Sequence, residues 1–135
     1  MGLFPRTRDI NVERIDEILC EAPDRLRMMR LIIKDVEEAV IETRSQEAMM
    51  LQQVRQLQRE AGEAERLQDD LTEDARHALA ADREDLARRA LNRKYDSIRK
   101  IEGLRQQADI LDARADAIAV EVSRLEDVLA AVKDR

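Results

Sequence analysis

Two long stretches of this chain place apolar residues alternately three and four positions apart, which is the spacing of a coiled-coil seam. The first seam runs from Leu26 to Ala78 with a few polar interruptions, and the second runs from Ile101 to Val132 with none. Three glycines and two prolines in 135 residues leave little material for the turns of a strand-based fold. The seams therefore predict two long helices.

A tight turn is expected between the seams, near residues 80–84. Asp82 is suited to cap a new helix, Asp85 occupies the capping-box position three residues later, and Leu86 follows. If the chain reverses there, seam residues face each other at a constant sum of residue numbers, 165. We predict an all-α fold, in which a long antiparallel two-helix coiled-coil hairpin (24–135) follows a short amphipathic helix (1–22).

The predicted core of the hairpin consists of apolar seam positions that keep this register. They are Ile33, Val36, Val40, Val54, Leu57, Ala61, Leu104, Ala108, Leu111, Ile118, Leu125 and Leu129. Gly62 and Gly103 share the register and weaken both helices at one level. That level is a bend, a close contact between neighbouring hairpins, or a pair of tolerated surface glycines.

Residues 1–22 form a separate segment, because Pro23 restricts the residue before it and Asp24 is a good N-cap for the next helix. On a helical wheel the apolar residues of this segment share one broad arc. Such an arc either packs on the hairpin as a short third helix or lies in a membrane interface, where basic groups attract anionic head groups. The residues that we predict to bind a membrane are Leu3, Phe4, Arg6, Arg8, Ile10, Ile15, Ile18 and Leu19.

Charge and cysteine content argue against several classes of function. The 24 basic and 30 acidic residues give a net charge of -6, which disfavours nucleic acid as a partner. His77 has no second His or Cys nearby to share a metal, and Cys20 has no partner that would make it a nucleophile. We therefore expect no catalytic residue, metal or cofactor.

No apolar run approaches the roughly 20 residues that span a bilayer, and no signal-peptide pattern opens the chain, so we expect a cytoplasmic protein.

Opposite charges gather on the two helices near the expected turn. Basic residues cluster within 88–100 and acidic residues within 63–74. The two groups either neutralise each other along the paired helices or form a patch that binds a partner.

Several motifs resemble the phage shock protein A family, which also contains the vesicle-inducing protein of plastids and cyanobacteria and is related to the ESCRT-III superfamily. The motifs are the opening Met-Gly-Leu-Phe, Arg30-Leu31-Ile32-Ile33, Glu42-Thr43-Arg44-Ser45 and Arg83-Glu84-Asp85-Leu86-Ala87-Arg88-Arg89-Ala90-Leu91. The resemblance implies a first helix that senses stressed or anionic membrane and a hairpin that assembles into homo-oligomers. It also implies that the hairpin region restrains an AAA+ transcription activator.

We accordingly expect a non-enzymatic membrane-stress protein on the inner face of the cytoplasmic membrane. It would bind anionic lipid through its first helix and self-assemble through its hairpin to support or remodel the membrane. One alternative is a regulatory coiled-coil module that binds and restrains an AAA+ activator with little membrane activity. A passive coiled-coil spacer is a third hypothesis, but it would not need the amphipathic first segment.

Overall fold

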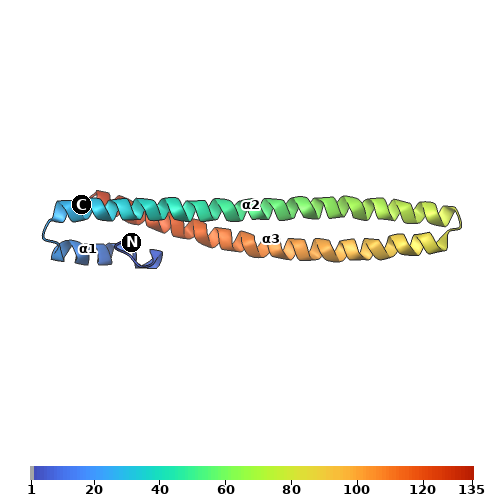
Figure 1. Cartoon of the computed structure of the whole chain (residues 1–135), viewed down its shortest axis with the longest axis horizontal. Coiled ribbons are helices and arrows are strands. Elements are labelled where there is room, and N and C mark those ends of the chain that lie inside the picture. The colour runs from blue at the N-terminus through green and yellow to red at the C-terminus, as the bar shows by residue number, and fades with distance from the viewer. Residues whose placement is uncertain (1) are drawn as a thin grey trace. The chain divides into compact units, whose positions relative to one another are not determined.

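The computed structural model describes residues 2–135, and Met1 lies outside this range. Its elements are a 3-10 helix η1 (Thr7–Asp9) and three α-helices, α1 (Val12–Glu21), α2 (Arg25–Ala80) and α3 (Glu84–Lys133). No strand occurs in the described part of the chain, so the fold is all-α as predicted, with α2 and α3 packed as a hairpin (Figure 1).

Tertiary contacts divide the chain into two units. One unit comprises the residues up to Met49 together with Arg114–Arg135, and the other comprises Met50–Ala113. Both α2 and α3 run through both units, whereas η1 and α1 belong to the first alone. The first unit is therefore a three-helix arrangement, and the second is a two-helix arrangement closed by the α2–α3 turn.

Polar side chains define where α1 and α2 begin. The side chain of Asn11 accepts a hydrogen bond from the N–H of Arg14 (2.8 Å) and so caps α1. The side chain of Asp24 accepts one from the N–H of Arg27 (3.2 Å) at the start of α2, just after Pro23. The predicted capping role of Asp24 is confirmed, because its carboxylate satisfies a backbone donor that has no partner within the helix.

The start of α3 corrects the prediction for the turn. Because α3 begins at Glu84, Asp82 is not its N-cap. Asp85 and Leu86 lie in the first turn of α3 rather than in the connection. The predicted location of the reversal, near residues 80–84, agrees with the ends of the two helices.

Asp82 has a different role, because it terminates α2. Its backbone is left-handed, with φ 59°. Its N–H donates to the carbonyl of Leu79 (3.1 Å), and the N–H of Arg83 donates to the carbonyl of Ala78 (2.8 Å). These two bonds form a Schellman motif, and Asp is one of the few residues besides Gly that tolerate its left-handed position.

One cluster of apolar side chains from all three helices forms the core of the first unit. Its buried members are Ile10, Ile15, Leu19, Ile32, Val36, Val40, Leu125, Val128 and Val132. Figure 1 shows α1 beside the first turns of α2, to which it is joined by a short connection. The sequence prediction placed Ile33 in the hairpin core, but Ile32 is fully buried and Ile33 only partly, since α1 covers the face that carries Ile32.

Small side chains dominate the core of the second unit. Besides a few larger residues, its buried positions are Ala61, Ala64, Ala75, Ala87, Ala90, Ala108 and Ser97.

Among the predicted hairpin-core residues of the whole chain, the structure buries Val36, Val40, Val54, Ala61, Leu104, Ala108 and Leu125. Ile33, Leu57, Leu111, Ile118 and Leu129 are partly buried. Two helices shield only one side of each other, so the longer seam side chains keep part of their surface in water.

Ion pairs across the hairpin follow the predicted register. Glu37 pairs with Lys133 (3.4 Å) and Arg44 with Glu126 in the first unit, and Glu65 pairs with Arg105 in the second. The residue numbers of each of the three pairs sum to 170. This sum is expected when the seam residues pair at 165 and the charged residues occupy the positions that flank the seam. The cross-helix ion pairs therefore support the predicted alignment.

Candidate functional site

The apolar residues of the N-terminal segment lie against the hairpin. Ile10, Ile15 and Leu19 have exposed fractions of 3%, 0% and 3%. Phe4 and Ile18 are partly buried and pack on the same cluster. Of the other residues predicted to bind a membrane, Leu3, Arg6 and Arg8 are exposed. The structure therefore brings the five more buried residues into one core and leaves the other three at its edge.

The N-terminal segment is not one continuous helix, which corrects the predicted helix over residues 1–22. Its α-helical part is limited to Val12–Glu21, and η1 at Thr7–Asp9 precedes it. Ile10 and Asn11 between them are extended, with ψ values of 98° and 161°. This break lets Ile10 enter the cluster beside Ile15 while Asn11 caps α1.

Arg124 of α3 binds the backbone at the break. Its guanidinium donates to the carbonyl of Ile10 (Nη1, 2.6 Å) and to the carbonyl of Thr7 (Nη2, 2.7 Å). Glu121, one turn earlier, holds this guanidinium through Nη2 to Oε1 (2.6 Å) and Nε to Oε2 (3.0 Å). The hydrogen bond from Arg124 keeps the pKa of the Glu121 carboxyl below its ordinary value, and the same bond raises the pKa of Arg124.

Two further contacts hold the segment. Arg135 binds the carboxylate of Asp16 on α1 through Nε (2.7 Å) and Nη2 (3.0 Å), and this bond lowers the pKa of Asp16. The N–H of Leu3 donates to the carboxylate of Asp35 on α2 (2.7 Å). The N-terminal segment is thus held by polar contacts from both long helices.

Sequence reasoning did not find the role of Arg124. Its spacing of three residues from Glu121 is the same as that of Arg14–Glu17 and Glu73–Arg76, which are ordinary surface pairs. The carbonyls that it binds lie 114 and 117 residues away in the chain. No local pattern signals such a contact.

The outward side of α1 is polar. Glu13, Arg14, Glu17, Cys20 and Glu21 are exposed, and Cys20 is a free thiol. In this state Ile10, Ile15 and Leu19 are part of the core of the first unit, and Glu13, Glu17 and Glu21 face water. The buried apolar residues can therefore contact a membrane only if the segment leaves the hairpin.

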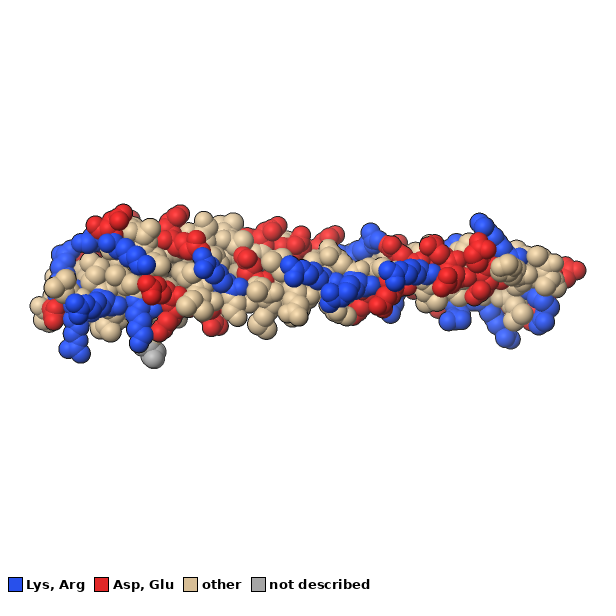
Figure 2. Space-filling model, turned by 90° about the horizontal axis from the view of Figure 1, so that it is seen from above, with Lys and Arg blue, Asp and Glu red and all other residues tan. Residues whose placement is uncertain are grey.

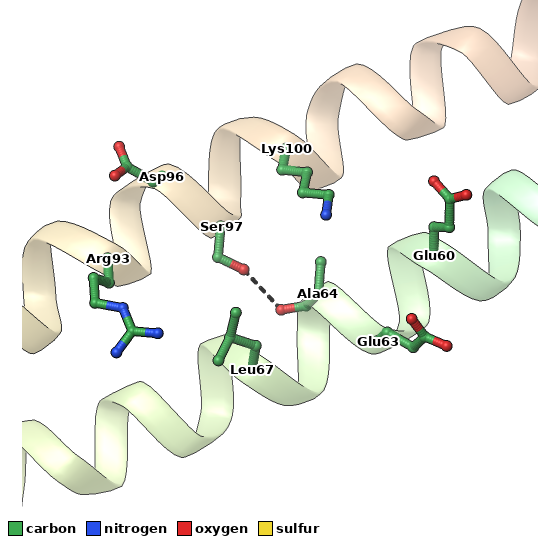
Figure 3. Close-up of a pocket in the computed structure, with 8 residues that line it drawn as sticks. All are labelled: Glu60, Glu63, Ala64, Leu67, Arg93, Asp96, Ser97 and Lys100. Carbon is green, nitrogen blue, oxygen red and sulfur yellow. Dashed lines mark hydrogen bonds between the residues drawn. The ribbon is translucent and has the colours of Figure 1, made fainter.

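The second unit contains a small opening between α2 and α3. A cavity of about 430 Å³ is lined by residues that include Arg93, Lys100, Glu60 and Ser97. Ser97 donates its hydroxyl to the carbonyl of Ala64 (2.8 Å), as Figure 3 shows. This hydrogen bond joins the two helices at the level of the cavity. No group of three or more His, Cys, Asp or Glu side chains in residues 2–135 could hold a metal.

The charged stretches near the turn are paired only in part. Glu65 pairs with Arg105, which lies beyond the basic stretch, whereas Glu73–Arg76 and Asp96–Arg99 lie within one helix. Figure 2 shows acidic side chains gathered over the stretch of α2 that precedes the turn. Direct ion pairs between the two stretches therefore account for little of the mutual neutralisation that the sequence suggested.

No helix in the described range is apolar over a stretch long enough to cross a bilayer.

Comparison with known proteins gives the family. A phage shock protein A homolog of Deinococcus radiodurans is 25% identical to this chain over 126 residues, which cover 93% of the chain and 56% of that protein. The chain thus spans little more than half the length of this curated relative. The model of the PspA/IM30 family matches residues 2–135, and the chain therefore belongs to this family.

Proposed function

We propose that this protein is a non-enzymatic membrane-stress protein of the phage shock protein A type. It binds anionic lipid on the inner face of the cytoplasmic membrane through its N-terminal segment, residues 2–21. It assembles with further copies through the hairpin to support or remodel the membrane. Family membership supports the general class, since the PspA/IM30 family is generally associated with membranes. The observation that carries the lipid-binding step is an N-terminal segment whose apolar and polar residues lie on opposite sides.

Docking on the hairpin sets how strongly the segment binds lipid. Fully burying an Ile, Leu or Phe side chain contributes about 1.5–3 kcal/mol. Ile10, Ile15 and Leu19 already obtain this contribution from the cluster, so moving them into a bilayer returns only the difference between two apolar environments. Attachment of a single chain is therefore weak, and several copies acting together make it useful.

The test uses variants that separate the apolar residues from their docking surface. Ile15→Asp places a charge in the segment itself and should abolish co-sedimentation with vesicles that contain phosphatidylglycerol. Val128→Asp charges the docking cluster on α3 and leaves the segment intact, so it should increase the bound fraction severalfold. Val120→Asp is the matched control, because Val120 is 71% exposed on the same helix and Val128 is 7% exposed.

Circular dichroism should show that all three variants keep the helical content of the hairpin. Equal sedimentation of the wild type and Ile15→Asp would contradict lipid binding through this segment. Self-assembly is measured separately, by sedimentation velocity over a range of protein concentrations without lipid. A single monomeric species throughout would contradict assembly through the hairpin.

The second candidate is a regulatory module that binds an AAA+ transcription activator. The observation that favours it is a set of exposed apolar side chains along α2, where Leu26, Ile41 and Met49 are 72%, 67% and 62% exposed. These side chains remain available while the N-terminal segment is docked. Ile41→Asp should then relieve inhibition of the activator's ATPase activity and leave vesicle binding unchanged. No effect of the protein on that ATPase activity would remove this candidate.

A further inference from the structure

We propose that the second unit, Met50–Ala113, opens and recloses as a separate part of the hairpin while the first unit stays folded. In the open state its two helix segments part and lose helical order, because most helical stability in proteins comes from tertiary packing. The first unit keeps its three-helix core and its docked N-terminal segment. Such opening requires neither lipid nor a second copy of the chain.

The apolar cores of the two units differ in the size of their buried side chains. Among the described residues, the largest side chains that are fully buried all belong to the first unit: Ile15, Ile32, Val36, Leu125 and Val132. In the second unit, four buried apolar side chains are larger than alanine: Val54, Leu71, Ile101 and Leu104. Hydrophobic stabilisation follows the apolar area removed from water, so the second unit obtains less of it from its core.

The second unit is also packed less completely. Cavities of about 430, 350 and 650 Å³ lie along its two helices, and every residue that lines them belongs to this unit. Figure 3 shows the first of these cavities between α2 and α3. A side chain that borders a void has no dispersion partner on that side. The two helices of this unit therefore attract each other over only part of their facing surfaces.

Few polar contacts tie the two helices together within residues 50–113. The hydroxyl of Ser97 donates to the carbonyl of Ala64 (2.8 Å), and Arg105 forms an ion pair with Glu65. The side chains of that ion pair are 61% and 45% exposed, so water competes for both charges and the pair adds little stability. One buried hydrogen bond thus remains as the main polar tie across this unit.

These features characterise a region that opens at a lower free energy than the whole fold. Opening removes the surface that the two helices of the second unit form together. A partner that contacts both helices would bind only the closed state and would therefore hold the unit closed. This half of the hairpin is the part whose closure a bound partner can control.

Native-state hydrogen exchange of the full chain tests the separate opening. The protein is measured at low concentration and without lipid, so that contacts between copies do not hold the second unit closed. In the wild type, the slowest amides of residues 54–108 should exchange at least about 100-fold faster than the slowest amides of residues 28–42 and 118–130. Equal protection of the two groups of amides would overturn the proposal.

Two glycine substitutions on α3 distinguish opening of one unit from unfolding of the whole hairpin. Gln106 in the second unit and Ala119 in the first are both exposed, and glycine at either position should shift a helix-unfolding equilibrium about fivefold. Gln106→Gly should therefore speed exchange of the second unit about fivefold. Ala119→Gly should speed exchange of the slowest amides of the first unit and leave the second unit unchanged, because the helix around residue 119 stays intact when the second unit opens.

Each variant can overturn the proposal. If Ala119→Gly speeds exchange equally in both units, the hairpin unfolds as one cooperative structure. If Gln106→Gly leaves exchange in the second unit unchanged, those amides exchange without unfolding of the helix that carries residue 106. The proposal is supported when the second unit responds to Gln106→Gly and not to Ala119→Gly.

Discussion

Replacing Gly62 and Gly103 with alanine should stabilise the hairpin. Both glycines lie inside long helices, and neither has a positive φ. A Cβ atom added at either position would meet no heavy atom within 4 Å apart from its chain neighbours and the nearby backbone of its own helix. Alanine therefore gains helix propensity without a steric cost, about 1 kcal/mol at each position and about 2 kcal/mol for the double variant.

Urea unfolding followed by circular dichroism measures this change. With a denaturant dependence of about 2 kcal/mol per molar urea, the double variant should shift the midpoint upward by about 1 M. Ala119→Gly is the opposite control, because Ala119 is an exposed residue within α3. Its midpoint should fall by about half as much. All unfolding measurements should be made at a low protein concentration, where contacts between copies contribute little to the free energy of unfolding.

One result would refute this reasoning. If Ala119→Gly lowers the midpoint but the double alanine variant does not raise it, the space around the glycines is not free in solution. The hypothesis of a close contact between neighbouring hairpins would then gain support. A full gain in stability with unchanged assembly would leave only tolerated surface glycines.

Three other outcomes follow from the structure. Arginine partners lower the pKa values of Asp16 and Glu121, so their stabilisation is present above the unfolded pKa of about 4 and lost as pH falls through the folded values. A dye on the single cysteine should therefore gain mobility below about pH 4, and constant anisotropy down to pH 2 would contradict this. Asp82→Val should destabilise the hairpin by about 1–2 kcal/mol in urea, because a β-branched residue fits the left-handed backbone poorly; an unchanged midpoint would argue against this turn geometry. Cysteines at Leu57 and Ala108, which line one cavity, should crosslink in an otherwise cysteine-free chain, and preferential crosslinking of a pair shifted by one heptad would refute the register.

The long helices and their alignment were predictable because their determinants are local and repeated. Heptad spacing recurs along both helices, and Asp24 supplies a cap whose partner is three residues away. A shift of register would misplace every seam residue and also the flanking ion pairs, such as Glu37–Lys133. Many weak signals therefore agree on one answer.

The ends of elements were harder to predict where two motifs compete for the same residues. Asp82 suits both an N-cap and a left-handed C-terminal position, and the sequence alone favours neither. The hydrogen bond from Arg83 back to Ala78 decides for the second, because it closes α2 before α3 begins. The predicted cap was wrong for this reason, although the turn is in the expected place.

The sequence by itself determined that the N-terminal segment has apolar residues that must be shielded from water. It did not determine whether the hairpin or a lipid surface covers them, because the same arc suits both. Tertiary structure decided for the hairpin in the described state, where Val128 and Ile32 provide the apolar contact and Arg124 binds the backbone at the break. These residues are distant in the chain from most of the segment, and a pattern within residues 1–22 carries no information about groups that only folding brings beside it.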